Sequence, residues 1–179
     1  MIQNRIKISK YLCFILRHHP EAIGLGLDSE GWASIDEIIQ KISRFKLTPE
    51  LIDYVMQTDD KQRFCISEDG TKIRANQGHS IDVNLNLKPL QPPEVLLHGT
   101  ANRFLENILE KGLLKQKRQF IHLTESESIA KAVGSRYGKP VILEITSVRM
   151  VEDGFIFYKS LNNVWLVEHV PVDYLKILF

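Results

Sequence analysis

Cysteine is scarce in this sequence, and long apolar runs are missing from it. The 179 residues include two cysteines, Cys13 and Cys65, which lie in apolar surroundings without the spacing of a metal site or a disulfide framework. We therefore expect buried free thiols in a reducing compartment. The apolar run at residues 11–16 is too short for a signal peptide or a membrane span, because Arg17 interrupts it. These absences predict a cytoplasmic protein that uses no metal and contacts no membrane.

An excess of charge of one sign is also missing. Lys and Arg number 23 against 22 Asp and Glu, so the formal net charge is +1. No overall field would attract nucleic acid, and local clusters would have to hold any polyanionic partner. Hydrophobic residues make up 44% of the chain, which is enough for a core, and the length fits one large unit or two small lobes. No long heptad pattern indicates an oligomer, so we expect a monomer.

The first half predicts three helices followed by a β-hairpin. Apolar residues recur at helical spacing before Pro20, which cannot continue a helix. This order is typical of a winged-helix domain, a common nucleic-acid-binding shape, although fold analogy alone does not assign function. The remaining signals are a capping box at Ser34 and Glu37, an N-cap at Thr48 before Pro49, and alternating apolar residues at 64–66 and 73–75.

The end of the first predicted helix concentrates basic groups at Arg17 and His18. The helix dipole favours positive charge there, which explains both residues without a ligand. An anion site is the alternative, because the planar fork of donors on Arg fits phosphate. If the site exists, we expect a phosphate or sulfate between Arg17 and Arg63.

The predicted hairpin carries Arg63 and Arg74 and runs into a polar tract at residues 76–80. Gly78 in this tract would let the backbone approach a ligand closely. A solvated hairpin surface is the alternative explanation, and we favour it for Lys61 and Lys72.

Prolines at 89, 92 and 93 interrupt the pattern and mark the best boundary, so we place the lobes at residues 1–91 and 92–179. Alternating apolar residues at 83–87 predict a strand just before it. Beyond it, short strands and short helices predict a mixed, mostly antiparallel split sheet, and the whole chain an α+β fold. The predicted strands are 95–97, 120–123, 141–145, 155–158, 164–170 and 174–178, and the predicted helices are 102–111, closed by Gly112, and 126–133, capped by Thr124.

The tract His98-Gly99-Thr100 follows a predicted strand in an arrangement that suits a nucleotide clamp. Glycine would let backbone groups bond a carboxamide, and histidine can reach a ribose hydroxyl. His122 lies one residue before the end of another predicted strand. A single histidine is more often a satisfied core residue than a ligand, and that alternative stays open for both.

The tracts at 9–12, 16–21, 31–32, 61–64, 73–80, 98–100 and 122–123 together resemble the RNA 2′-phosphotransferase family in order and spacing, from about residue 9 to about residue 170. The resemblance implies an N-terminal winged-helix RNA-binding lobe and a C-terminal lobe of ADP-ribosyltransferase fold that holds NAD. It also implies a metal-free reaction in two steps. The 2′-phosphate inside an RNA, as some tRNA ligations leave it, attacks the nicotinamide ribose of NAD and expels nicotinamide. The ribose 2″-hydroxyl then attacks the phosphate, which releases 2′-hydroxyl RNA and ADP-ribose 1″,2″-cyclic phosphate.

The resemblance also implies roles for particular residues. Arg suits a phosphate nucleophile because it stays charged and does not protonate it, and His18 can protonate the leaving 2′-oxygen in the second step. Unlike many ADP-ribosyltransferases, the run 163–167 lacks a glutamate, with Glu168 just beyond. The implied catalytic residues are Arg17, His18, Arg63 and Arg118; the NAD site is His98, Gly99, Thr100, His122 and Thr124; and the RNA phosphate site is Arg74, Asn76, Gln77, Gly78 and His79.

Two other functions remain open from the sequence. One is an ADP-ribosyltransferase that caps terminal phosphates of nucleic acids and stops after the first step. The other is a winged-helix regulator that binds nucleic acid without catalysis. Product analysis distinguishes the first from the two-step reaction, because the nucleic acid would stay ADP-ribosylated. Undetectable nicotinamide release would indicate the second.

Overall fold

The structure is a computed structural model that describes residues 2–178. The chain divides into two compact units, unit 1 ending at Asn86 and unit 2 beginning at Leu87. Both units combine short helices with small antiparallel sheets, which confirms the α+β class. No helix among residues 2–178 has the length and apolarity to cross a bilayer. Each unit contains its own hydrophobic cluster, so each fold can be explained from its own residues.

Unit 1 contains the three predicted helices, and the N-caps of the second and third are confirmed. The Ser34 hydroxyl accepts from the Glu37 N–H at 3.3 Å, and the Thr48 hydroxyl accepts from the Leu51 N–H at 3.3 Å. The Glu37 carboxylate instead accepts from the Gly26 N–H at 3.4 Å, so only the Ser34 half of the predicted capping box is seen among the described residues. The first helix ends before Pro20, as expected, because proline lacks the N–H that a continuing helix needs. The helices are α1 (Ile2–Arg17), α2 (Ile35–Lys41) and α3 (Pro49–Gln57), with a 3-10 turn η1 (Pro20–Ile23) after α1.

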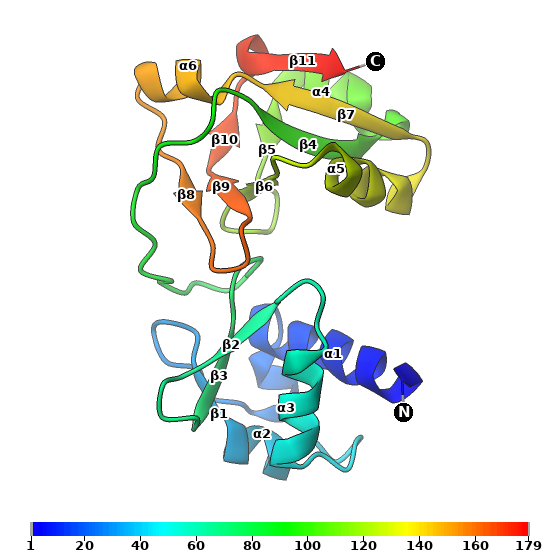
Figure 1. Cartoon of the computed structure of the whole chain (residues 1–179), viewed down its shortest axis with the longest axis vertical. Coiled ribbons are helices and arrows are strands. Elements are labelled where there is room, and N and C mark those ends of the chain that lie inside the picture. Colours follow the sequence, from blue (N-terminus) through cyan, green and yellow to red (C-terminus); the bar gives the residue numbers. More distant parts are fainter. Residues whose placement is uncertain (1, 179) are drawn as a thin grey trace. The chain divides into compact units, whose positions relative to one another are not determined.

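A three-stranded antiparallel sheet of order β1-β3-β2 completes unit 1. The predicted hairpin forms from β2 (Phe64–Ile66) and β3 (Lys72–Ala75), and β1 (Ala33–Ser34) pairs with the other edge of β3 (Figure 1). One face of α1 closes the core, because each of its inward side chains is at most 1% exposed and burying each contributes roughly 1.5–3 kcal/mol. Those side chains are Ile8, Leu12, Ile15 and Leu16.

The strand predicted at 83–87 is wrong. Val83 and Leu85 are buried, as their alternation indicates, but this segment pairs with no strand among the described residues. The Asn84 N–H donates instead to the Ser29 carbonyl at 2.8 Å, and Asn86 takes a positive φ of 53°. Alternation reports which side chains are buried, and it does not supply a neighbouring strand.

The largest sheet of unit 2 has the order β11-β7-β4, with every pair antiparallel. Its strands are β4 (Leu96–Ala101), β7 (Pro140–Ile145) and β11 (Leu175–Leu178). Helix α5 (Glu127–Gly134) packs on β4 and β7 (Figure 1). The tract 98–100 therefore lies inside β4 and under a helix.

The prediction of one strand at 164–170 is wrong, because this segment contributes to two smaller antiparallel sheets. It divides at Glu168 into β9 (Trp165–Val167) and β10 (His169–Val170), which pair with different partners. The predicted strand 155–158 is reduced to β8, and no parallel pair occurs among residues 2–178, so the sheets are not mixed. One of these sheets has the order β6 (Ile121–Leu123), β9, β8 (Tyr158–Lys159). The other pairs β10 with β5 (Leu113–Leu114).

Short helices connect these sheets. The predicted cap of α5 is wrong by two residues, because the Ser126 hydroxyl accepts from the Ile129 N–H at 3.4 Å, while the Thr124 hydroxyl accepts from the Ser126 N–H at 3.1 Å. Gly112 ends α4 as predicted, with φ 76°. The remaining helices are η2 (Asn102–Phe104), α4 (Leu105–Lys111), η3 (Ser135–Tyr137), α6 (Ser147–Glu152) and η4 (Val172–Tyr174).

Candidate functional site

In unit 1, the C-terminal end of α1 holds Arg17 and His18 in fixed positions. The main-chain N–H of Ser80 donates to the Arg17 carbonyl at 2.9 Å, and the Ser80 hydroxyl lies 2.9 Å from Nδ1 of His18. Ser80 is 62 residues further along the chain, and it fixes both the helix end and the imidazole ring. Because Nδ1 is committed to Ser80, proton transfer by this ring would use Nε2.

Arg63 lies beside Arg17. A guanidinium N–H of Arg17 donates to the Arg63 carbonyl at 3.4 Å across 46 positions of sequence. The Arg63 guanidinium pairs with the carboxylate of Asp59, whose side chain is 4% exposed and also accepts the Arg63 main-chain N–H at 2.6 Å. Burial raises the pKa of the Cys13 thiol, and the charges of Arg17 and Arg63 oppose that rise, so both guanidinium groups lie near one turn of α1. Unit 1 therefore brings these two arginines together.

His79 lies near Arg17 and His18 and is 1% exposed. Neither ring nitrogen has a hydrogen-bond partner among residues 2–178. Burial, followed by the positive charges of Arg17, His18 and Arg74, lowers its pKa from 6.5 to about 4. His79 is therefore neutral at neutral pH and adds no further positive charge to the cluster.

Arg74 lies on the hairpin and is held by residues of the segment just before β1. Its guanidinium carbon lies 4.4 Å over the centre of the Trp32 ring, and it donates to the Glu30 carbonyl at 3.3 Å. The side chain is 13% exposed. In the following tract, Oε1 of Gln77 is buried without a partner among the described residues, and Gly78 has φ 91°, which favours glycine.

Asn76 supports the turn that carries Arg63. Its side-chain N–H group donates to the carbonyls of Gln62 at 2.6 Å and Phe64 at 3.2 Å, and the residue is 6% exposed. Gln62 takes a positive φ of 43°, a conformation that a non-glycine residue adopts only when its surroundings hold it. The amide of Asn76 is thus engaged in placing Arg63.

In unit 2, a chain of contacts joins His98, His122 and Arg118. Nδ1 of His98 lies 3.0 Å from the His122 carbonyl, so Nδ1 carries the proton and Nε2 can accept one. The Arg118 guanidinium donates to Nδ1 of His122 at 2.8 Å. Burial, assisted by the charge of Arg118, lowers the pKa of His98, so its ring is neutral at neutral pH. These contacts connect the basic loop before β6 with β4.

Gly99 and Thr100 lie where β4 meets α5. A Cβ built on Gly99 would lie 2.5 Å from the Ala130 carbonyl carbon and nearer still to its oxygen. A Cβ on Gly134 would crowd the Thr100 carbonyl in the same way, and Thr100 is 7% exposed. The absence of a side chain at position 99 therefore lets α5 approach β4, in addition to any role toward a ligand.

Glu125 is a polar residue in unit 2 that sequence reasoning does not single out. It follows Thr124, whose N–H and carbonyl pair with Leu97 of β4. Its carboxylate accepts from the Trp165 indole N–H at 2.7 Å and from Lys159 at 3.0 Å, and these bonds lower its pKa. Asp59 is missed as well, although its place four residues before Arg63 is a sequence signal, and Ser80 lies in the predicted polar tract without a role assigned to it.

Comparison with known proteins gives a consistent result. The family model described as RNA 2′-phosphotransferase, Tpt1/KptA family, matches residues 3–169. Three similar proteins each carry the name "Probable RNA 2′-phosphotransferase". The one from Acaryochloris marina is 54% identical over 176 residues, which cover 97% of each chain. The one from Flavobacterium johnsoniae is 51% identical with 94% of each chain covered, and the one from Pseudomonas fluorescens is 50% identical with 95% of each covered.

Proposed function

Because the chain belongs to the RNA 2′-phosphotransferase family, Tpt1/KptA, we propose that it removes an internal 2′-phosphate from RNA with NAD as co-substrate. The family match over residues 3–169 carries this proposal, since it includes the candidate groups of both units. An RNA 2′-phosphotransferase is a transferase, so we treat the protein as an enzyme. That it acts as a cytoplasmic monomer on a tRNA-like substrate belongs to the same proposal.

We assign the two functional lobes to residues 1–91 and 92–179, which places residues 87–91 of unit 2 in the first lobe. In the first, three helices followed by a hairpin support a winged-helix RNA-binding lobe. In the second, small antiparallel sheets, of which the β11-β7-β4 sheet is covered by α5, support a lobe of the ADP-ribosyltransferase type. In this scheme the first lobe holds the RNA phosphate and the second holds NAD.

The chemistry of unit 2 fits NAD. The neutral ring of His98 offers Nε2 as an acceptor for a ribose hydroxyl, and β4 supplies main-chain groups at Gly99 and Thr100 for a carboxamide. His122 and Thr124 flank this strand through the contacts described above. NAD supplies an electrophilic ribose carbon whose leaving group is nicotinamide.

The proposed reaction has two steps, and in each step one bond forms as another breaks. In the first, an oxygen of the 2′-phosphate forms a bond to that ribose carbon as the bond to nicotinamide breaks. In the second, the ribose 2″-hydroxyl bonds to phosphorus, loses its proton, and displaces the RNA 2′-oxygen, which takes up a proton. The products are 2′-hydroxyl RNA and ADP-ribose 1″,2″-cyclic phosphate.

The roles of the basic residues follow from the charge of a phosphate dianion. Arg17, Arg63 and Arg118 orient and neutralise it without protonating it, because arginine does not release its proton at neutral pH. His18 protonates the leaving 2′-oxygen from Nε2, with its ring held by Ser80. Asn76 supports the turn that carries Arg63, and the buried His79 lies near Arg17 and His18. Arg74, Gln77 and Gly78 belong to the tract that we assign to the RNA phosphate.

The test is incubation of a 2′-phosphorylated oligonucleotide with NAD, followed by separation of nicotinamide, RNA and nucleotide products. The wild type should yield cyclic phosphate and dephosphorylated RNA, and Arg63→Ala should slow turnover by about 100-fold or more, as expected when a charge-stabilising donor is removed. Arg149→Ala is the matched control, since Arg149 also pairs with an aspartate four residues away but is exposed. A stable ADP-ribosylated RNA would indicate the terminal-phosphate transferase, and no nicotinamide release would indicate the regulator.

A further inference from the structure

A row of rings runs along the outer face of α1 in unit 1. Tyr11 and Phe14 lie with ring centroids 6.0 Å apart and nearly parallel, at 26°. The next contact joins Phe14 to His19 at 4.8 Å. At the other end, Phe45 meets Tyr11 at 5.8 Å, and Arg44 lies 5.7 Å over both of those rings. We call these five residues the aromatic row.

The Phe14 side chain is not part of the hydrophobic core of unit 1. It is 40% exposed, while its neighbours Leu12, Ile15 and Leu16 on the same helix are fully buried. A helix of this kind needs only one apolar face to pack. The exposed phenyl ring is therefore available to a partner from solution.

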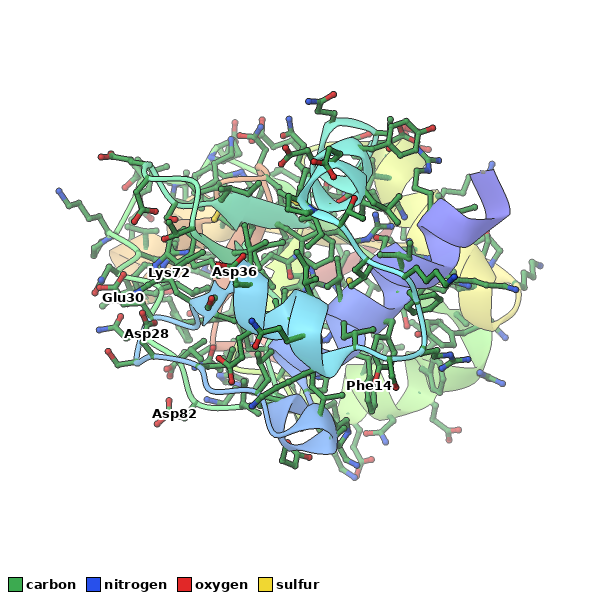
Figure 2. The ribbon with its side chains drawn as sticks, turned by 90° about the horizontal axis from the view of Figure 1, so that it is seen from below. Phe14, Asp28, Glu30, Asp36, Lys72 and Asp82 are labelled. Carbon is green, nitrogen blue, oxygen red and sulfur yellow. The ribbon has the colours of Figure 1, made fainter. Side chains whose placement is uncertain are left out.

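The charge around the aromatic row favours an anionic partner. Helix α1 carries four basic residues and no acidic residue, and Lys7, Lys10 and Arg44 are exposed. Figure 2 shows Phe14 to the right of the labelled acidic side chains, of which Asp28, Glu30 and Asp82 lie at the left of the view and Asp36 nearer the middle. Glu21 is an acid beside the row, and it is bonded to His19 at 2.9 Å.

The aromatic row adjoins Arg17 and His18, the candidate phosphate-binding residues at the end of α1. The ring of His19 lies 6.5 Å from that of His18, which is bonded to Ser80 beside Arg17. Two ring contacts therefore lead from Phe14 to His18, with centroid separations of 4.8 Å and 6.5 Å. Sequence-tolerant binding of single-stranded RNA commonly combines basic groups with exposed aromatic rings on which unpaired bases stack.

We propose that Phe14, supported by Tyr11 and His19, is a stacking site for the unpaired nucleobase adjacent to the 2′-phosphorylated nucleotide. Arg44 and the lysines of α1 hold the RNA backbone leading to it. This inference rests on the proposed function and names how the RNA is held. It explains why an apolar ring is kept exposed beside a group of cations.

The experiment uses two oligonucleotides with 2-aminopurine on the 5′ or the 3′ side of the 2′-phosphorylated nucleotide, because stacking quenches its fluorescence. Binding to the full chain without NAD should quench one of the two probes. Phe14→Ala and Phe14→Leu should remove that quenching and weaken binding about tenfold, within the range of one base–aromatic stack. Phe14→Tyr should restore both. An abasic residue in place of the probe should weaken wild-type binding by the same factor and leave Phe14→Ala unaffected.

Phe104→Ala is the matched control. Phe104 is 42% exposed, touches Tyr137 and lies under Arg103, but belongs to unit 2. If Phe14→Ala binds and quenches like the wild type while the wild type still releases nicotinamide, the stacking site is wrong and the proposed function stands. If the wild type neither binds the phosphorylated RNA nor releases nicotinamide, both fail. A change in sedimentation of Phe14→Ala in place of a change in RNA binding would show that the row joins two copies of the chain.

Discussion

Replacing Gly99 by alanine should destabilise unit 2 severely. The new methyl carbon would lie 2.5 Å from the Ala130 carbonyl carbon, and this separation must grow to at least 3.0 Å. The methyl carbon would be fixed directly to the main chain of β4, and its neighbour is the main chain of α5, so no side chain can rotate out of the way. Overpacking typically costs about 1–3 kcal/mol, and we expect about 3 kcal/mol or more here because a helix must separate from its sheet.

For a unit of this size, about 3 kcal/mol lowers the melting temperature by roughly 12–24 °C. Calorimetry on the full chain measures this directly, and Gly26→Ala is the control. Gly26 has no positive φ and its nearest neighbour is a flexible carboxylate oxygen 4.0 Å away, so alanine fits there. A stable Gly99→Ala variant that has lost only NAD binding would refute the packing argument and show that the glycine serves the ligand.

Three further predictions concern the candidate residues. Asp59→Asn should cut turnover about 100-fold at unchanged secondary structure, because Arg63 loses the carboxylate that orients it, as measured in single-turnover assays. Ser80→Ala should slow the second step about fivefold through the lost bond to His18, which would appear as accumulated ADP-ribosylated RNA, and Ser80→Thr should recover it. The stability that neutral His79 lends is complete above about pH 6.5 and is lost as pH falls toward about 4, because the unfolded state takes up the proton first. Urea unfolding should show the wild type losing about 3 kcal/mol more than His79→Gln between pH 7 and pH 4.

Local chemistry in the sequence was sufficient for the elements that depend on it. The stop before Pro20 and the caps at Ser34 and Thr48 need only neighbouring residues, and the structure confirms them. The strand at 83–87 and the cap at Thr124 failed for a different reason. In the first, burial alternates without a partner strand, and in the second, a serine two residues later competes for the same role.

Predicting the candidate site from sequence has a similar limit. Residue type, order and the family resemblance predict roles for Arg17, Arg63 and His122, but not which groups hold them. The carboxylate of Asp59 and the hydroxyl of Ser80 take their positions from tertiary contacts over turns and long sequence distances. Such supporting residues have ordinary types in ordinary segments, and only the fold reveals them.

The separate hydrophobic clusters of the two units have a consequence during synthesis. Every buried residue of the first cluster lies between Ile8 and Ala75, and its sheet is complete at the same point. A nascent chain on the ribosome can thus bury that cluster before most of the second unit has been translated. Arg17 and Arg63 would then already be placed when the strand bearing His98 emerges from the exit tunnel.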